Sequence, residues 1–193
     1  MPRPERHILT APARSRAREN TLFVAQLDDQ SRRLRADTRG LTRAGLEWQP
    51  APGMNTIGML LAHLAIVEVF WMQIGPLGRT SPSTRAALGI GVDDDGMPLA
   101  ASGRPPQGLA GRTLAFYDDL LARARAHTRE VAATLTDADL DREFKRTRRD
   151  GRVQILNLRW VFYHVLEHFA GHYGQILLLR HQFRAVGRKQ VRR

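Results

Sequence analysis

The sequence predicts an all-α protein, a four-helix bundle of up-down-down-up topology, built from one domain that spans residues 1–193. Long segments carry apolar residues at the 3–4 spacing of amphipathic helices, whereas alternating β-branched runs are scarce. About thirty residues rich in Gly, Pro, Ser and Asp separate the second helical segment from the third. A connection of this length is often functional, and it lets the third helix run in the same direction as the second. The core is expected within residues 13–185, with a basic tail at each end.

The first two helices are delimited by recognisable signals. The first is predicted over residues 13–39 and ends near Gly40. A turn-rich stretch with two prolines and two glycines follows it. Thr56 is suited to cap a second helix over residues 57–74, and Pro76 ends that helix. The apolar stripe of the second helix comprises Leu60, Leu64, Val67, Trp71 and Ile74.

The third and fourth helices complete the predicted bundle. The third is expected over residues 110–135, where apolar side chains recur at the spacing of bundle packing. The letters LTDADLD and a basic polar segment follow, and we expect this basic segment to be a loop. The fourth helix is predicted over residues 157–183.

The net charge of +11 is concentrated at the two ends of the chain. Residues 1–18 carry a net charge of +4 and residues 180–193 one of +6, so the segment between them is close to neutral. A basic tail binds polyanions non-specifically. The simpler interpretation is a pair of solvated ends, so nucleic acid is not the expected partner.

The absence of cysteine excludes a disulfide framework and a thiolate metal site. Any metal must then be held by His, Asp, Glu or water. The N-terminus lacks the apolar run of a signal peptide, and no run of about 18 apolar residues occurs. We therefore expect a cytoplasmic protein without a membrane span.

Four of the seven histidines fall in one stretch of the fourth helix, YHVLEHFAGHYGQILLLRH. Residues four apart on a helix differ by about 40° in direction, so His168 and His172 share its apolar face. His164 lies on the flank of that face, and His181 points to the opposite side, towards solvent. His63 points inward from the second helix.

Inward histidines on two helices have two interpretations. They bond to one another, to carbonyls or to water, or they share one divalent metal. Neutral imidazole suits zinc and nickel, as well as copper and iron. Three protein ligands leave one position for water or substrate, as in catalytic zinc sites. His63, His168 and His172 are the candidate ligands, with zinc or nickel as the expected metal.

Two segments resemble the signatures of the DinB-like superfamily. The first, LTRAGLEWQPAPGMNTIGMLLAHLAIVE, joins a Trp-x-Pro turn to a Thr-capped helix with one histidine. The second, WVFYHVLEHFAGHYGQI, carries HxxxH followed by Gly-Gln-Ile. The resemblance covers about residues 20–185, and the DDDGMPL segment is similar to an uncharacterised, actinobacterial-type branch. It implies the same bundle topology, a divalent metal on His63, His168 and His172, and a homodimer; His164 matches an extra histidine that is not usually a ligand.

Known activities of the superfamily imply a thiol-dependent S-transferase or isomerase that acts on a small-molecule substrate. The metal would bind a low-molecular-weight thiol as thiolate and present its sulfur to an electrophile. Because the chain has no cysteine, that sulfur must come from a cofactor. One alternative is a metal-dependent hydrolase, for which no inward carboxylate is evident as a base. Another is a non-catalytic metal-binding stress-response protein.

Several polar residues near these motifs have competing interpretations. Glu167 does not form the metalloprotease motif HExxH, and we interpret it as a surface or pairing residue rather than a general base. Gln175 is suited to form a hydrogen bond with a metal-binding histidine, or a simple interhelical hydrogen bond. The acidic run Asp93–Asp95 is expected to be a solvated turn, with a base or an extra ligand as the alternative.

Aromatic and basic residues complete the candidates. Trp48 is expected to pack in the core at the turn before the second helix. Trp71 and Tyr117 are expected to be core residues, with a pocket lining as the alternative. An exposed face is the expected place of three arginines, which would otherwise bind an anionic thiol or a carboxylate substrate: Arg159, Arg180 and Arg184.

Overall fold

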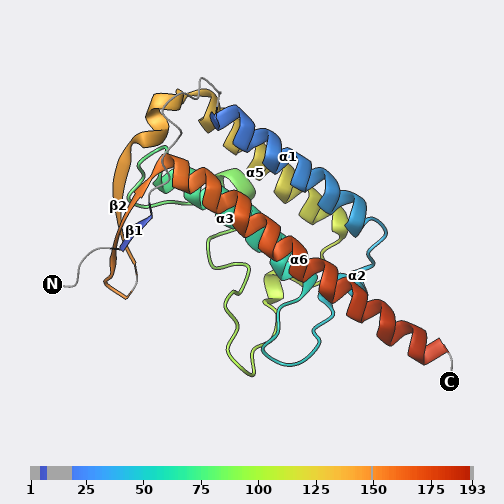
Figure 1. Ribbon diagram of the computed structural model, residues 1–193. Helices are drawn as coiled ribbons and strands as arrows, with labels where there is room; N and C mark the ends of the chain where they lie inside the picture. The colour runs from blue at the N-terminus through green and yellow to red at the C-terminus, as the bar shows by residue number, and fades with distance from the viewer. Residues whose placement is uncertain (1–4, 8–18, 149, 192–193) are drawn as a thin grey trace.

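The structure is a computed structural model that describes residues 5–7, 19–148 and 150–191. Four long helices pack side by side (Figure 1): α1 (Glu19–Thr38), α3 (Ile57–Ile74), α5 (Leu114–Ala133) and α6 (Leu158–Val191). Four short helical segments lie in the connections: α2 (Arg43–Glu47), α4 (Arg85–Leu88), and the 3-10 helices η1 (Gln107–Leu109) and η2 (Asp137–Asp141).

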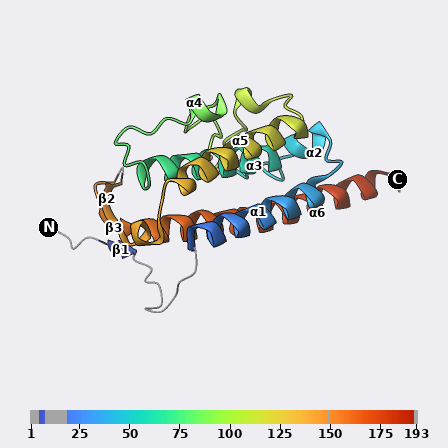
Figure 2. The same cartoon turned by 90° about the horizontal axis from the view of Figure 1, so that it is seen from above.

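The long helices form two layers, with α1 beside α6 and α3 beside α5 (Figure 2). Contacts between α1 and α5 and between α3 and α6 join the layers. The two helices of one layer run in one direction and those of the other layer run in the opposite direction. The long connection between α3 and α5 makes this possible, because it returns the chain to the end at which α3 began.

The expectation of a strictly all-α fold is wrong, because a three-stranded sheet lies at one end of the helices. Its order is β1-β3-β2, with β1 (Glu5–His7) parallel and β2 (Glu143–Thr147) antiparallel to β3 (Val153–Asn157). The basic segment that we expected to be a loop therefore forms a β-hairpin. An Asp-Gly dipeptide at the turn, with Gly151 at φ 79°, is a strong hairpin signal and was available in the sequence.

Most helix ends confirm the sequence signals. The second predicted helix matches α3 at both ends, and the Thr56 hydroxyl accepts a hydrogen bond from the backbone N–H of Met59. The fourth helix continues to Val191, past the predicted end. Residues 13–18 of the first predicted helix and most of the N-terminal basic tail lie outside the described residues. The rest of that tail includes β1, so it is not simply a solvated end.

The core centres on α3, of which fourteen residues are buried. Its 18 residues have a mean hydropathy of 1.8, enough by length and composition to cross a membrane, yet 78% of them are buried inside the protein. The helix is buried because α5 packs against it within its own layer and α6 packs against it from the other layer. The same helix carries His63, so the core positions the candidate site.

Buried charges also join the helices. The guanidinium of Arg125 on α5 donates to both carboxylate oxygens of Glu68 on α3, over 2.7 and 3.0 Å, and to Asp28 on α1 over 3.0 Å. Arg159, which we expected on an exposed face, is only 5% exposed and pairs with Glu19 and Asp141. That expectation is wrong because α1 and η2 cover the start of α6.

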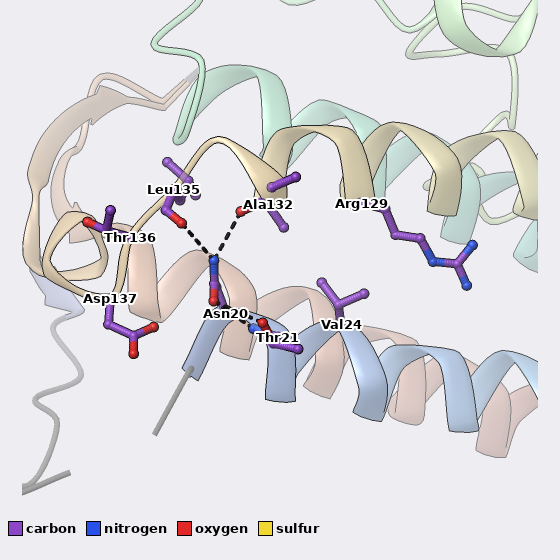
Figure 3. Close-up of a pocket in the computed structure, with 9 residues that line it drawn as sticks. Asn20, Thr21, Val24, Arg129, Ala132, Leu135, Thr136 and Asp137 are labelled. Carbon is purple, nitrogen blue, oxygen red and sulfur yellow. Dashed lines mark hydrogen bonds between the residues drawn. The ribbon is translucent and has the colours of Figure 1, made fainter. Parts of the chain in front are cut away.

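The start of α1 is tied to the end of α5 (Figure 3). The Asn20 amide donates to the carbonyl oxygens of Ala132 and Leu135, over 3.0 Å each. Carbonyl groups at a helix C-terminus lack N–H donors within the helix, and the Asn20 amide supplies a donor in their place. Beside it lies an open cavity of about 450 Å³, whose lining includes Arg129 and Asp137.

Candidate metal centre

Three histidines from two helices converge between the layers. His63 comes from α3, and His168 and His172 lie one turn apart on α6. The Nε2 atom of His168 lies 3.1 Å from Nε2 of His63 and 3.1 Å from Nε2 of His172. The candidate ligand atoms of all three rings lie within 4.8 Å of one another. The predicted ligand set is therefore brought together in space.

Two of these rings are held in orientation by a partner on the opposite nitrogen. Asp95 Oδ2 lies 2.7 Å from Nδ1 of His63, and Gln175 Oε1 lies 2.8 Å from Nδ1 of His172. Both oxygens accept, so Nδ1 carries the proton in each neutral ring and the lone pair sits on Nε2. These lone pairs point towards His168. Gln175 thus takes the role of bonding a candidate metal ligand.

The surroundings of His168 and His172 favour the neutral imidazole. Burial, followed by the neighbouring charges of His172, His63 and His164, lowers the pKa of His168 to about 3. Burial also lowers the pKa of His172, against the opposing effect of the hydrogen bond that its Nδ1 donates to Gln175. Metal ions bind the neutral imidazole ring. At neutral pH His168 is already in that form, so it need not lose a proton to become a ligand.

The donor set fits a divalent metal better than a set of mutual hydrogen bonds. His168 has a single proton to offer at Nε2, yet two lone pairs face that atom, so one contact would remain unsatisfied. A cation satisfies all three nitrogens together. A tetrahedral centre with Zn–N bonds of about 2.0–2.1 Å separates its nitrogens by about 3.3 Å, close to the 3.1 Å between these atoms.

The other histidines of α6 are placed as the helical geometry predicts. His164 stacks on Trp160 with ring centroids 4.6 Å apart, and its Nδ1 lies 3.1 Å from Glu167 Oε1. It adjoins the cluster without entering it. Glu167 is an exposed pairing residue, as expected, and His181 is exposed.

The acidic run of the long connection differs from the favoured interpretation. Asp95 is 2% exposed, so it is not part of a solvated turn. Besides contacting His63, it accepts a hydrogen bond from the backbone N–H of Met97 through Oδ1. Asp94 instead accepts from the backbone N–H of Gly91 and pairs with Arg85. Asp94 and Asp95 thus have distinct surroundings, which their identical letters do not reveal.

The remaining candidates are structural or peripheral. Trp48 packs on the core and against the ring of Phe183, at 5.9 Å between centroids. Trp71 and Tyr117 are buried, as expected of core residues. Arg180 is half-buried, 3.9 Å from Asp37, and Arg184 is exposed.

Comparisons with known proteins identify a family and a similar fold. The profile of a family described as mycothiol-S-transferase matches residues 22–185. A solved structure from Enterococcus faecalis, described as a conserved protein of a locus, is similar with a TM-score of 0.61 and 15% identity. The similarity covers 83% of this chain and 94% of that one, and it shows a shared fold. No curated protein matches the chain. With the family profile spanning both signature segments and the three histidines, the chain belongs to the mycothiol-S-transferase family of the DinB-like superfamily.

Proposed function

We propose that this protein is a metal-dependent transferase that joins the sulfur of a low-molecular-weight thiol, mycothiol in the first instance, to an electrophilic small molecule. The observation that carries the proposal is the convergence of three imidazoles whose Nε2 atoms face one another. The family described as mycothiol-S-transferase supports the thiol. We also propose that the protein is a four-helix bundle and a homodimer, as the family resemblance implies.

Each residue of the centre has a distinct role in the proposed reaction. His63, His168 and His172 would hold zinc or nickel, which when bound lowers the pKa of a thiol and supplies its thiolate at neutral pH. Asp95 fixes the tautomer of His63 and raises the basicity of its Nε2. Gln175 fixes the orientation of His172 in the same way.

A hydrolase is less well supported by the same geometry. A hydrolytic site needs a carboxylate or another base that is available to accept a proton. Among the described residues, Asp95 is the carboxylate that bonds to a histidine of the cluster, His63, and both of its oxygens already accept hydrogen bonds. The residues of the centre therefore favour holding a metal over abstracting a proton from water.

The proposal is tested with zinc-loaded and nickel-loaded protein, mycothiol and 1-chloro-2,4-dinitrobenzene. A C–S bond forms, the C–Cl bond breaks, chloride leaves with the electron pair, and the thiol proton passes to solvent. We expect metal-dependent formation of the thioether, and its loss in His168→Ala. His164→Ala is the matched control, because His164 lies on the same helix outside the cluster.

Two results would contradict the proposal. One is the absence of turnover by metal-loaded protein with mycothiol, bacillithiol, glutathione and cysteine across several electrophiles. The other is turnover that is unchanged by metal removal and by His168→Ala. A protein that binds metal and loses stability without it, yet turns over no thiol, would instead have a structural metal.

A further inference from the structure

A row of aromatic rings leads away from the three histidines. On α6, His164 lies one turn before His168, with ring centroids 5.7 Å apart, and it stacks on Trp160 at an interplanar angle of 7°. Trp71 on α3 meets the edges of both rings, at 4.8 Å from His164 and 5.5 Å from Trp160. The row thus joins the candidate metal centre to the end of the fold that carries the sheet.

A cation lies at the far end of this row. The guanidinium of Arg146 on β2 lies 4.7 Å from the ring centroid of Trp71 and 5.6 Å from that of Phe70. Arg146 is half-buried, because β2 places it on the inner face of the hairpin and its neighbours on the outer face. The side chain is therefore aimed back over α3.

The surroundings of Arg146 leave its charge uncompensated within the described part of the chain. No carboxylate described there forms an ion pair with it. Burial, followed by the charge of Arg148, lowers its pKa, so its charged form is disfavoured by both causes. The fully buried Arg125, by contrast, is matched with a carboxylate. A bound anion would offset both the burial of the Arg146 charge and its repulsion by Arg148.

The stacked arrangement is suited to a carboxylate. The guanidinium carbon of Arg146 lies over the ring of Trp71, and a guanidinium held over a ring can still use its in-plane N–H groups in a bidentate pair. Phe70 and Trp160 are half-buried and offer apolar surface beside Trp71. Trp71 lies eight residues after His63, which corresponds to about 12 Å along the helix. A ligand that approaches both ends must therefore be elongated, with its carboxylate and its electrophilic carbon at opposite ends.

We propose that Arg146 is a specificity-determining residue that binds the carboxylate of a planar, unsaturated electrophile, while the electrophilic carbon faces the three-histidine centre. This inference rests on the proposed function, since the thiolate at the centre defines which end of the ligand reacts. The site selects anionic electrophiles over neutral ones of the same shape. Phe70 and Trp160 contribute apolar contact with the planar part.

Binding is measured first, without any reaction. Benzoate and benzamide are titrated into the zinc-loaded protein, and the indole N–H resonances of Trp71, Trp160 and Trp48 are followed by NMR. We expect benzoate to bind more tightly than benzamide and to shift Trp71 and Trp160 but not Trp48. In Arg146→Gln the Kd for benzoate should rise about 10- to 100-fold, the range for loss of a charged hydrogen-bonded pair, while benzamide is unaffected.

Two variants on the same strand control this experiment. Lys145→Gln removes a positive charge from the opposite face of β2 and should leave benzoate binding unchanged. Arg146→Lys keeps the charge but loses the planar fork, so partial rescue is expected even if Arg146→Gln fails to fold. Equal binding of benzoate and benzamide by wild type, or equal losses in Lys145→Gln and Arg146→Gln, would overturn the proposal.

The kinetic arm identifies which substrate carries the anion. With saturating thiol, Arg146→Gln should raise KM for 4-chloro-3-nitrobenzoate about 10- to 100-fold and leave KM for 4-chloro-3-nitrobenzamide unchanged. A rise in KM for the thiol alone would contradict the assignment to the electrophile. If no thiol is turned over, the proposed function fails, yet the benzoate titration still decides whether Arg146 binds an anion.

Discussion

Asp95 and His63 are joined by a hydrogen bond of 2.7 Å between Oδ2 and Nδ1, although 32 positions separate them in the chain. Asp95 belongs to the long connection between α3 and α5, so this bond fastens that connection to the candidate metal centre. The connection therefore takes part in the site rather than merely linking two helices. The same bond sets the tautomer that aims the His63 lone pair at the position proposed for the metal.

Removal of the Asp95 carboxylate should weaken metal binding without removing a ligand. We expect Asp95→Ala to lower zinc affinity about 10- to 100-fold, the usual effect of a partner behind a metal-binding histidine. Asp95→Asn should lose less, because its amide oxygen can still accept from Nδ1 of His63. Zinc affinity is measured by competition with a chromophoric chelator. Asp94→Asn is the control; an equal loss there would assign the effect to the connection as a whole.

His168 and His172, the two histidines of the HxxxH pair, should each be required for metal binding. Their neighbour His164 should not be required. His168→Ala and His172→Ala should bring zinc content, measured by elemental analysis after reconstitution, from about one per chain to near zero. His164→Ala should retain it, since its ring stacks on Trp160. A metal-free wild type after reconstitution with zinc and nickel would contradict the assignment.

The metal-free protein should lose stability in acid through His168. Its pKa is lowered from 6.5 to about 3, so between these values the unfolded chain binds the proton more readily than the folded one. Stability is thus unaffected above pH 6.5 and falls as the pH is lowered towards 3. At pH 5 the loss is about 2 kcal/mol, or about 4–8 °C in Tm. Thermal unfolding in EDTA should decline less steeply in His168→Gln; parallel curves for the two proteins would refute this.

The buried arginine of α5 should be a strong determinant of stability. Arg125→Met leaves the carboxylate of Glu68, itself 1% exposed, buried without its partner, and should cost about 3–5 kcal/mol in the free energy of unfolding. Arg129→Met removes an exposed arginine that pairs with Asp28, and should cost less than about 1 kcal/mol. Urea unfolding compares the two. Equal costs would show that burial of the Glu68 pair does not matter.

Local patterns in the sequence were sufficient for the helices and for the direction of their histidines. The apolar stripe and Thr56 defined α3, and rotation along a helix separated the inward His168 and His172 from His164 and His181. These features depend on residues within a turn or two of one another, so they can be derived without knowledge of the fold. The family resemblance then matched the ligand set across the two helices.

Contacts between distant segments required the tertiary structure. The partner of His63 is Asp95, which lies in a connection without periodicity, and nothing local distinguishes it from Asp93 and Asp94. The burial of Arg159 depends on α1 and η2, and the position of Arg146 depends on the pairing of β2 with β3. Sequence alone determined which side chains face inward on each helix. The fold decided which of them meet, because the free energy of a buried charge or hydrogen bond depends on partners that distant segments supply.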